Sequence, residues 1–173
     1  MIISIEEFNA NFNNLTVKEG IKCLGLDTAF KKTGWCKIET TKHDLKIEYG
    51  YFHVTSENKY IAYDKIIDFF ANIIEPLSVV VIEDTFFSFN PAMFRVISRI
   101  GAMAYTIASL KKCEPSYMLA TSARKNLGLP AIKKKKEVHK AFIEKIGISF
   151  DDEDIIDAMI LALNGVTTKL SII

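Results

Sequence analysis

Short apolar runs without helical spacing mark the strands that we expect in this chain. Residues 21–26 form a short, mainly apolar run and residues 79–82 a fully apolar one, both typical of strands buried within a sheet. Residues 33–40 and 45–54 are rich in β-branched and aromatic side chains, and a short polar segment joins them, which predicts an antiparallel hairpin. A last short strand is predicted at 116–119.

Helical patterns alternate with these strands. A broad apolar face with helical period predicts a helix over 58–75, stopped by Pro76, and Pro91 opens a second helix that runs to about Lys112. Further helices are predicted at 121–128, 133–146 and 152–168. This order predicts an α/β fold: a mixed five-stranded sheet, with three antiparallel strands first, flanked by helices.

The beginning of the chain has a pattern of its own. Ser4-Ile-Glu-Glu7 has the form of a capping box and predicts a short helix over 4–14. We therefore expect residues 1–20 to be an N-terminal appendage. Residues 21–168 are expected to form one domain, since 173 residues is an ordinary length for a single domain.

Composition excludes several classes of protein. Apolar residues make up 49% and charged residues 25% of the chain, which is typical of a globular protein. No apolar run approaches the roughly 18 residues of a membrane span. The first twenty residues contain three glutamates and no arginine, so we expect no signal or transit peptide and a cytoplasmic, soluble protein. Three cysteines without C-x-x-C spacing predict neither a disulfide framework nor a zinc site.

Charge is distributed unevenly along the sequence. The net charge of +1 divides into −4 for residues 1–94, +9 for 95–145 and −4 for 146–173. A basic middle beside an acidic end suggests a polyanionic partner and a carboxylate-rich site for a cation. Taken alone, the lysine run at 133–136 is more typical of a solvated helix start.

Four acidic residues have positions that suit metal chemistry. Asp27 and Glu83 follow two predicted strands, where ligands bind in open α/β sheets. Asp154 and Asp157 are three residues apart on a predicted helix and so share one face. Each alone is more typical of a helix cap or a solvated loop. Together they would repel one another without a hard cation such as Mg²⁺ or Mn²⁺, and two such ions can hydrolyse a phosphodiester.

These motifs resemble the RuvC-type Holliday junction resolvases of the ribonuclease H-like superfamily. The resemblance covers roughly residues 21–165. It rests on Gly25-Leu-Asp27, Thr33-Gly34-Trp35, Val80-Val-Ile-Glu83 and Asp154-Ile-Ile-Asp157-Ala-Met-Ile-Leu-Ala, in the family's order and spacing. Many relatives have Pro-Gly where this chain has Thr28-Ala29, which indicates a divergent branch of phage or mobile-element type.

The resemblance implies a catalytic set and a DNA-binding set. Metal binding would fall to Asp27, Glu83, Asp154 and Asp157, with two Mg²⁺ per site and Mn²⁺ able to substitute. Lys135 would complete the catalytic set, with Lys134 and Lys136 left open as alternatives. DNA binding is expected from Phe86, stacking on a base at the crossover, and from Arg124, Lys125, Lys133, Lys134, Lys136 and Arg95. The family works as a homodimer.

The expected activity is therefore resolution of four-way (Holliday) DNA junctions by metal-dependent hydrolysis, giving paired symmetric nicks with 5′-phosphates. A nuclease of the same fold acting on other branched DNA, flaps or RNA–DNA hybrids is one alternative, because the carboxylates do not distinguish these substrates. A non-catalytic DNA-binding module is another, although clustered carboxylates would not help a binder of phosphate. His139, on a predicted helix, is expected to be an ordinary core or surface histidine.

Overall fold

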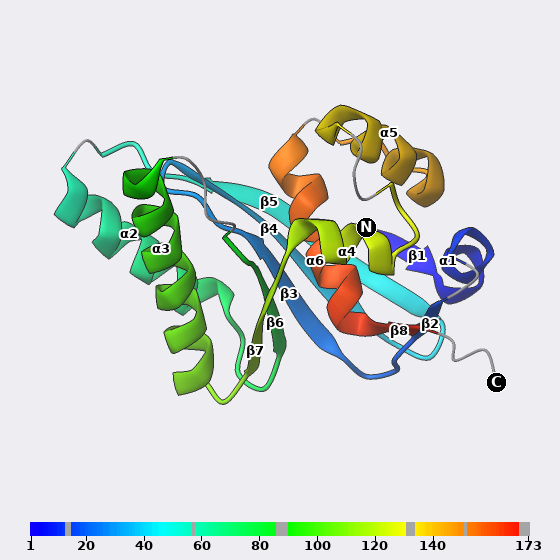
Figure 1. The fold of residues 1–173 in the computed structure, drawn as a ribbon. Coiled ribbons are helices and arrows are strands. Elements are labelled where there is room, and N and C mark those ends of the chain that lie inside the picture. The colour runs from blue at the N-terminus through cyan, green and yellow to red at the C-terminus, as the bar shows by residue number, and fades with distance from the viewer. Residues whose placement is uncertain (13–14, 57, 86–89, 131–133, 151, 170–173) are drawn as a thin grey trace.

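A mixed sheet with strand order β1-β5-β4-β3-β6-β7 runs through the molecule (Figure 1). The structure, a computed structural model, describes all residues except 13–14, 57, 86–89, 131–133, 151 and 170–173. Strands β3 (Lys22–Asp27), β4 (Lys32–Thr40) and β5 (Asp44–His53) are antiparallel neighbours, while β6 (Val79–Glu83) and β7 (Glu114–Met118) continue the sheet parallel to β3. The predicted α/β class, with three antiparallel strands first, is confirmed.

The sheet has six strands in the described residues, not the five that we predicted. The additional strand, β1 (Ile2–Ser4), pairs antiparallel with the edge strand β5. A three-residue strand is too short to show an alternating pattern, so its pairing depends on the open edge of β5. Helix α1 (Ile5–Asn11) follows at once, and the Ser4 hydroxyl caps it by accepting a hydrogen bond from the backbone N–H of Glu7.

A second, smaller ladder joins the two ends of the chain. Strand β2 (Leu15–Val17) pairs antiparallel with β8 (Thr167–Lys169). Our predicted helix over 152–168 is therefore too long: the observed helix α6 (Glu153–Val166) ends where β8 begins. Strand β8 pairs with a segment about 150 residues away, and this pairing overrides the local helical pattern. A pattern read from neighbouring residues cannot reveal such a distant partner.

Helices cover both faces of the sheet (Figure 1). Helices α2 (Lys59–Ile73) and α3 (Pro91–Leu110) pack on one face. Helices α4 (Ala120–Asn126), α5 (Lys135–Ile146) and α6 pack on the other, together with α1. No described helix combines the length and the apolar character needed to cross a membrane.

Helix α6 lies unusually close to the sheet. A Cβ atom at Gly25 of β3 would lie 2.1 Å from the carbonyl oxygen of Ala158, and one at Gly34 of β4 would lie 2.2 Å from that of Asp154. Real side chains do not approach backbone atoms this closely, so only glycine fits at these two positions. The close contact brings the start of α6 to the carboxyl end of β3.

We predict that Gly34→Ala destabilises the protein by about 3 kcal/mol, because the added methyl group meets backbone atoms that cannot rotate away. This corresponds to a fall in melting temperature of about 6–12 °C for a domain of this size. Gly101→Ala in α3 is the control, since its nearest contact, at 3.3 Å, is the ring of Tyr117. Thermal unfolding should place that control within about 1 kcal/mol of the parent protein. Equal losses for both variants would contradict the prediction.

Candidate active site

Two acidic side chains meet at the carboxyl ends of β3 and β6. These strands are parallel neighbours with Leu26 opposite Ile82, so the next residues, Asp27 and Glu83, leave the sheet side by side. Burial, together with a hydrogen bond to and repulsion from Glu83, raises the pKa of Asp27 well above its usual range. The neutral, protonated form of Asp27 is therefore favoured more strongly than that of an ordinary aspartate.

Asp157 of α6 is buried and has three cationic or polar partners. Lys135 Nζ lies 2.8 Å from its Oδ2, while Arg124 Nη2 and His139 Nε2 lie 3.2 and 3.1 Å from its Oδ1. Burial alone would raise the pKa of Asp157, but the hydrogen bonds to His139 and Lys135 outweigh it and lower the pKa to about 2. Asp157 is thus held ionised.

Asp154 lies one helical turn before Asp157 and is contacted by two lysines. Lys32 Nζ is 2.9 Å from its Oδ2, and Lys135 Nζ is 3.7 Å from its Oδ1. Lys135 therefore contacts both helical carboxylates, as expected for residues three apart on one helix face.

The two pairs of carboxylates lie within electrostatic reach of each other. The negative charge of Asp157 contributes to the raised pKa of Asp27, and Lys135 partly offsets this effect. Glu83, Arg124 and Asp157 also line one small cavity between the sheet, α4 and α6. Lys135 therefore lies near Asp27, Asp154 and Asp157, and Glu83 adjoins the same region through Asp27 and through the cavity that it lines with Asp157.

The donor chemistry of this region fits a hard divalent cation. All four acidic side chains offer carboxylate oxygens, and the pKa of Asp27 is raised by burial and by the nearby Glu83, both of which disfavour a charge that a cation would stabilise. The described residues nevertheless contain no group of three His, Cys, Asp or Glu side chains that is already arranged around a common metal position. Lysine ammonium groups neutralise the helical pair in this arrangement.

The residues expected to bind DNA have different environments. Lys125 on α4, Lys134 and Lys136 around the start of α5, and Arg95 on α3 are exposed. Arg124 is mostly buried and paired with Asp157. Among the described lysines of the run, Lys135 is the one that contacts the carboxylates. Phe86 and Lys133 lie outside the described residues.

Sequence reasoning missed two residues of this region, His139 and Lys32. His139 lies four residues after Lys135 on α5, so the helical period alone places both on one face, toward Asp157. Lys32 lies two residues before Gly34 on β4, and Gly34 is the register partner of Asp27. Strand alternation therefore places Lys32 on the sheet face that carries Asp27.

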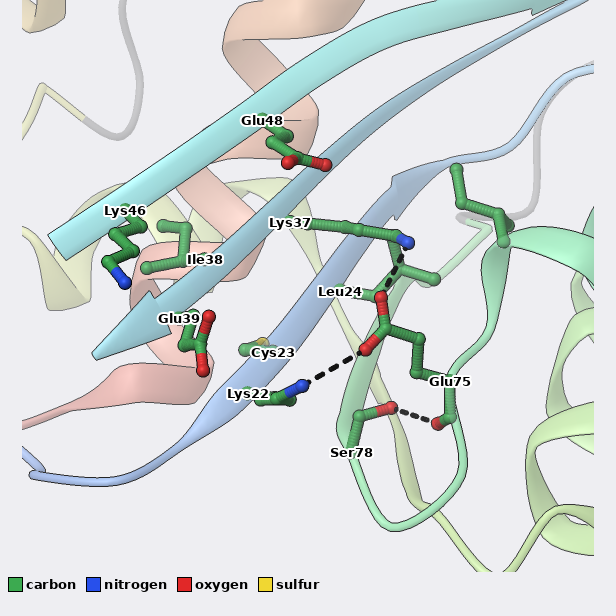
Figure 2. A pocket seen from close by; sticks show the side chains of 11 residues that line it. Lys22, Cys23, Leu24, Lys37, Ile38, Glu39, Lys46, Glu48, Glu75 and Ser78 are labelled. Carbon is green, nitrogen blue, oxygen red and sulfur yellow. Dashed lines mark hydrogen bonds and ion pairs between the residues drawn. The ribbon is translucent and has the colours of Figure 1, made fainter. Parts of the chain in front are cut away.

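A separate cavity lies at the other end of β3, on the face covered by α2 (Figure 2). Three of its charged side chains pair with one another: Lys22 and Lys37 both contact Glu75, at 3.3 and 2.8 Å. We assign no function to this cavity.

Comparison with solved structures shows that this chain shares its fold with proteins described as Holliday junction resolvases. RuvC from Thermus thermophilus, solved in complex with a Holliday junction substrate, matches with a TM-score of 0.66 at 13% sequence identity, over 87% of this chain and 99% of that one. The yeast mitochondrial Holliday junction resolvase Ydc2 matches with a TM-score of 0.59 at 14% identity, over 90% and 81% of the two chains. Fowlpox virus resolvase, solved with substrate Holliday junction DNA, gives 0.52 at 15% identity, over 83% and 95%.

The resemblance to RuvC-type resolvases predicted from the sequence is confirmed at the level of the fold. No family model and no curated protein matches the sequence.

We predict that Asp27→Asn makes the metal-free protein more stable at neutral pH. The raised pKa means that a neutral Asp27 favours the folded state, and this benefit is lost as the pH rises through the folded-state pKa. Melting curves in EDTA should show a gain of a few degrees at pH 7.5, each 1 kcal/mol being worth about 2–4 °C. The gain should shrink as the pH falls through the folded-state pKa and vanish below the ordinary value of 3.8.

The exposed residue Asp64 on α2 supplies the control, and Asp64→Asn should leave the melting temperature unchanged at every pH. An unchanged or lower melting temperature of Asp27→Asn at pH 7.5 would show that Asp27 and Glu83 do not oppose folding.

Proposed function

We propose that this chain is a metal-dependent endonuclease that resolves four-way DNA junctions. The observation that carries the proposal is the proximity of two acidic strand ends, at Asp27 and Glu83, to the helical carboxylates Asp154 and Asp157, with Lys135 contacting the helical pair. The fold shared with solved resolvases supports the same activity. A binding module would gain nothing from carboxylates placed where phosphates must approach.

The four carboxylates would hold the cations, which we propose to be two Mg²⁺ ions with Mn²⁺ able to substitute. When bound, such ions activate water for attack on phosphorus and stabilise the departing 3′ oxygen, leaving a 5′-phosphate. Hydrogen bonds to His139, Lys135 and Arg124 keep Asp157 ionised and oriented, so that it is ready to act as a ligand.

Basic side chains around the carboxylates would hold the DNA. Lys135, at the start of α5, would position the scissile phosphate and offset its charge. The exposed lysines 125, 134 and 136 would contact neighbouring phosphates, in keeping with the net charge of +9 over residues 95–145. Phosphate contacts carry little sequence information, so the shape of the junction would dominate selection.

A homodimer would explain how both strands of a junction are cut. Two copies related by a two-fold axis present two identical sites, which suits the symmetry of a four-way junction. Paired symmetric nicks are the expected product. Phe86, three residues after Glu83, would stack on an unpaired base at the crossover.

The direct test is cleavage of a synthetic four-way junction in Mg²⁺. We expect paired symmetric nicks that EDTA abolishes, and much slower cutting of matched duplex, flap and RNA–DNA hybrid substrates. Asp27→Asn should reduce cleavage at least about 1,000-fold while junction affinity changes only a few-fold, because the ligand is lost and the basic surface is not. Asp64→Asn serves as the matched control.

Junction binding without cutting in Mg²⁺ or Mn²⁺ would refute the nuclease. If flaps or hybrids were cut as fast as junctions, the proposed metal-dependent hydrolysis would stand, but the proposed specificity for four-way junctions would be wrong.

Substitutions of Lys135 and of its neighbour Lys134 should affect different properties, the cleavage rate and the DNA affinity respectively. Lys135→Ala removes the ammonium group that contacts Asp154 and Asp157, so we expect a fall in cleavage rate of about 100-fold or more at saturating junction. Lys134→Ala removes an exposed charge, and should weaken binding a few-fold in a salt-dependent way without slowing saturated cleavage. Single-turnover rates and binding curves separate the two effects, and equal rate losses would remove the special role of Lys135.

A further inference from the structure

Lys32 ties the start of α6 to the sheet through two carboxylates. Its Nζ lies 2.5 Å from Oδ2 of Asp152 and 2.9 Å from Oδ2 of Asp154. The Lys32 side chain is 32% exposed, and those of Asp152 and Asp154 are 18% and 29% exposed, so solvent only partly screens these ion pairs. The ring of Tyr51 lies beside the same ammonium, 5.3 Å away.

The backbone fixes this arrangement. Lys32 lies on β4 two residues before Gly34, where the carbonyl oxygen of Asp154 occupies the space of a Cβ atom. Asp152 is the N-cap of α6, and its Oδ1 accepts a hydrogen bond of 2.9 Å from the backbone N–H of Asp154. The close contact between Gly34 and the backbone of Asp154, which helps to form the carboxylate site, therefore also places Lys32 beside Asp154.

Both carboxylate oxygens of Asp154 are engaged by lysines, Oδ2 by Lys32 and Oδ1 by Lys135. A cation that uses Asp154 as a ligand therefore competes with at least one of these ammonium groups for an oxygen and is repelled by both. Lys135 has its closer partner in Asp157, at 2.8 Å, and lies 3.7 Å from Asp154. Lys32 is the nearer of the two to Asp154, at 2.9 Å, and its pair with Asp152 holds it beside that carboxylate.

The other half of the site differs. Among the described residues, Asp27 and Glu83 have no ion pair with a lysine or arginine, and Lys135 acts on Asp27 only through space. A cation entering between them relieves repulsion and displaces no ammonium group. A cation entering at Asp154 must compete with one.

We propose that Lys32 is an internal competitor for the cation at Asp154 and so sets the metal concentration at which this half of the site is filled. The inference rests on the proposed function, because it concerns the cation of that same site.

The test is Mn²⁺ binding to the metal-free full chain, measured by isothermal titration calorimetry without DNA. Lys32→Met removes the ammonium group and keeps the apolar stem. We expect it to bind Mn²⁺ about three- to tenfold more tightly at the weaker site, the range that loss of a partly exposed ion-pair network allows. Lys32→Arg, which keeps the charge, should bind like the parent protein.

Lys31→Met is the matched control, since it removes the same charge from an exposed neighbour on the chain. Its affinity should stay within about twofold of the parent protein, as screening between exposed charges predicts. If Lys31→Met and Lys32→Met increased the Mn²⁺ affinity equally, the increase would be explained by net charge alone, and the inference would be overturned.

Weaker Mn²⁺ binding by a cooperatively folded Lys32→Met would also overturn it, because Lys32 would then hold Asp154 in place for the cation. If Lys32→Met does not fold, Lys32→Gln carries the same test, since it keeps a hydrogen-bond donor without the charge. A parent protein that binds no Mn²⁺ at millimolar concentration would instead refute the metal dependence in the proposed function.

Discussion

The backbone of α6 rests on β3 and β4 at a distance that leaves no room for a side chain at Gly25 or Gly34. This contact places Asp154 and Asp157 beside the strand-end carboxylates and within reach of lysines from β4 and α5. Two charges 4 Å apart repel by about 4 kcal/mol at an effective dielectric constant of 20. Burial of one large apolar side chain contributes about 1.5–3 kcal/mol, and α6 buries several, among them Ile156, Ile160 and Leu163. The free energy gained by burying the apolar side chains of α6 therefore outweighs the repulsion between the carboxylates.

The four carboxylates share a chemistry but not an environment. Hydrogen bonds to His139 and Lys135 stabilise the charge of Asp157, whereas burial beside Glu83 destabilises the charge of Asp27. Among the described residues, the strand pair has no ion pair with a lysine or arginine, whereas ammonium groups already neutralise the helical pair. A divalent cation would stabilise the strand pair most, and at the helical pair it would compete with lysine ammonium groups. Unequal filling of the two metal positions that we propose would follow from how these elements pack.

Much of this arrangement could be predicted from the sequence, because the informative segments are long or strongly patterned. The apolar run 79–82, the hairpin and the helix beginning at Pro91 all appear where the pattern places them. Strand β1 and the β2–β8 ladder did not appear in the prediction, since three-residue strands depend on a distant partner. Asp27 and Glu83 were visible as strand-end acids. The roles of Lys32 and His139 were not, because which carboxylate each one meets is decided by how α5 and α6 dock on the sheet.

The start of α5 shows how a uniform run of lysines acquires distinct environments. Lys134 has extended backbone angles as the N-cap, and Lys135 is the first helical residue, so the chain turns between them. Positive charge at a helix N-terminus opposes the helix dipole, which makes this run unfavourable for α5 itself. For Lys135, ion pairs with Asp157 and Asp154 offset this unfavourable interaction with the helix dipole. Lys134 and Lys136 are exposed. A run that weakens its own helix is better explained by a binding role than by the fold, which agrees with the DNA contacts that we propose for these lysines.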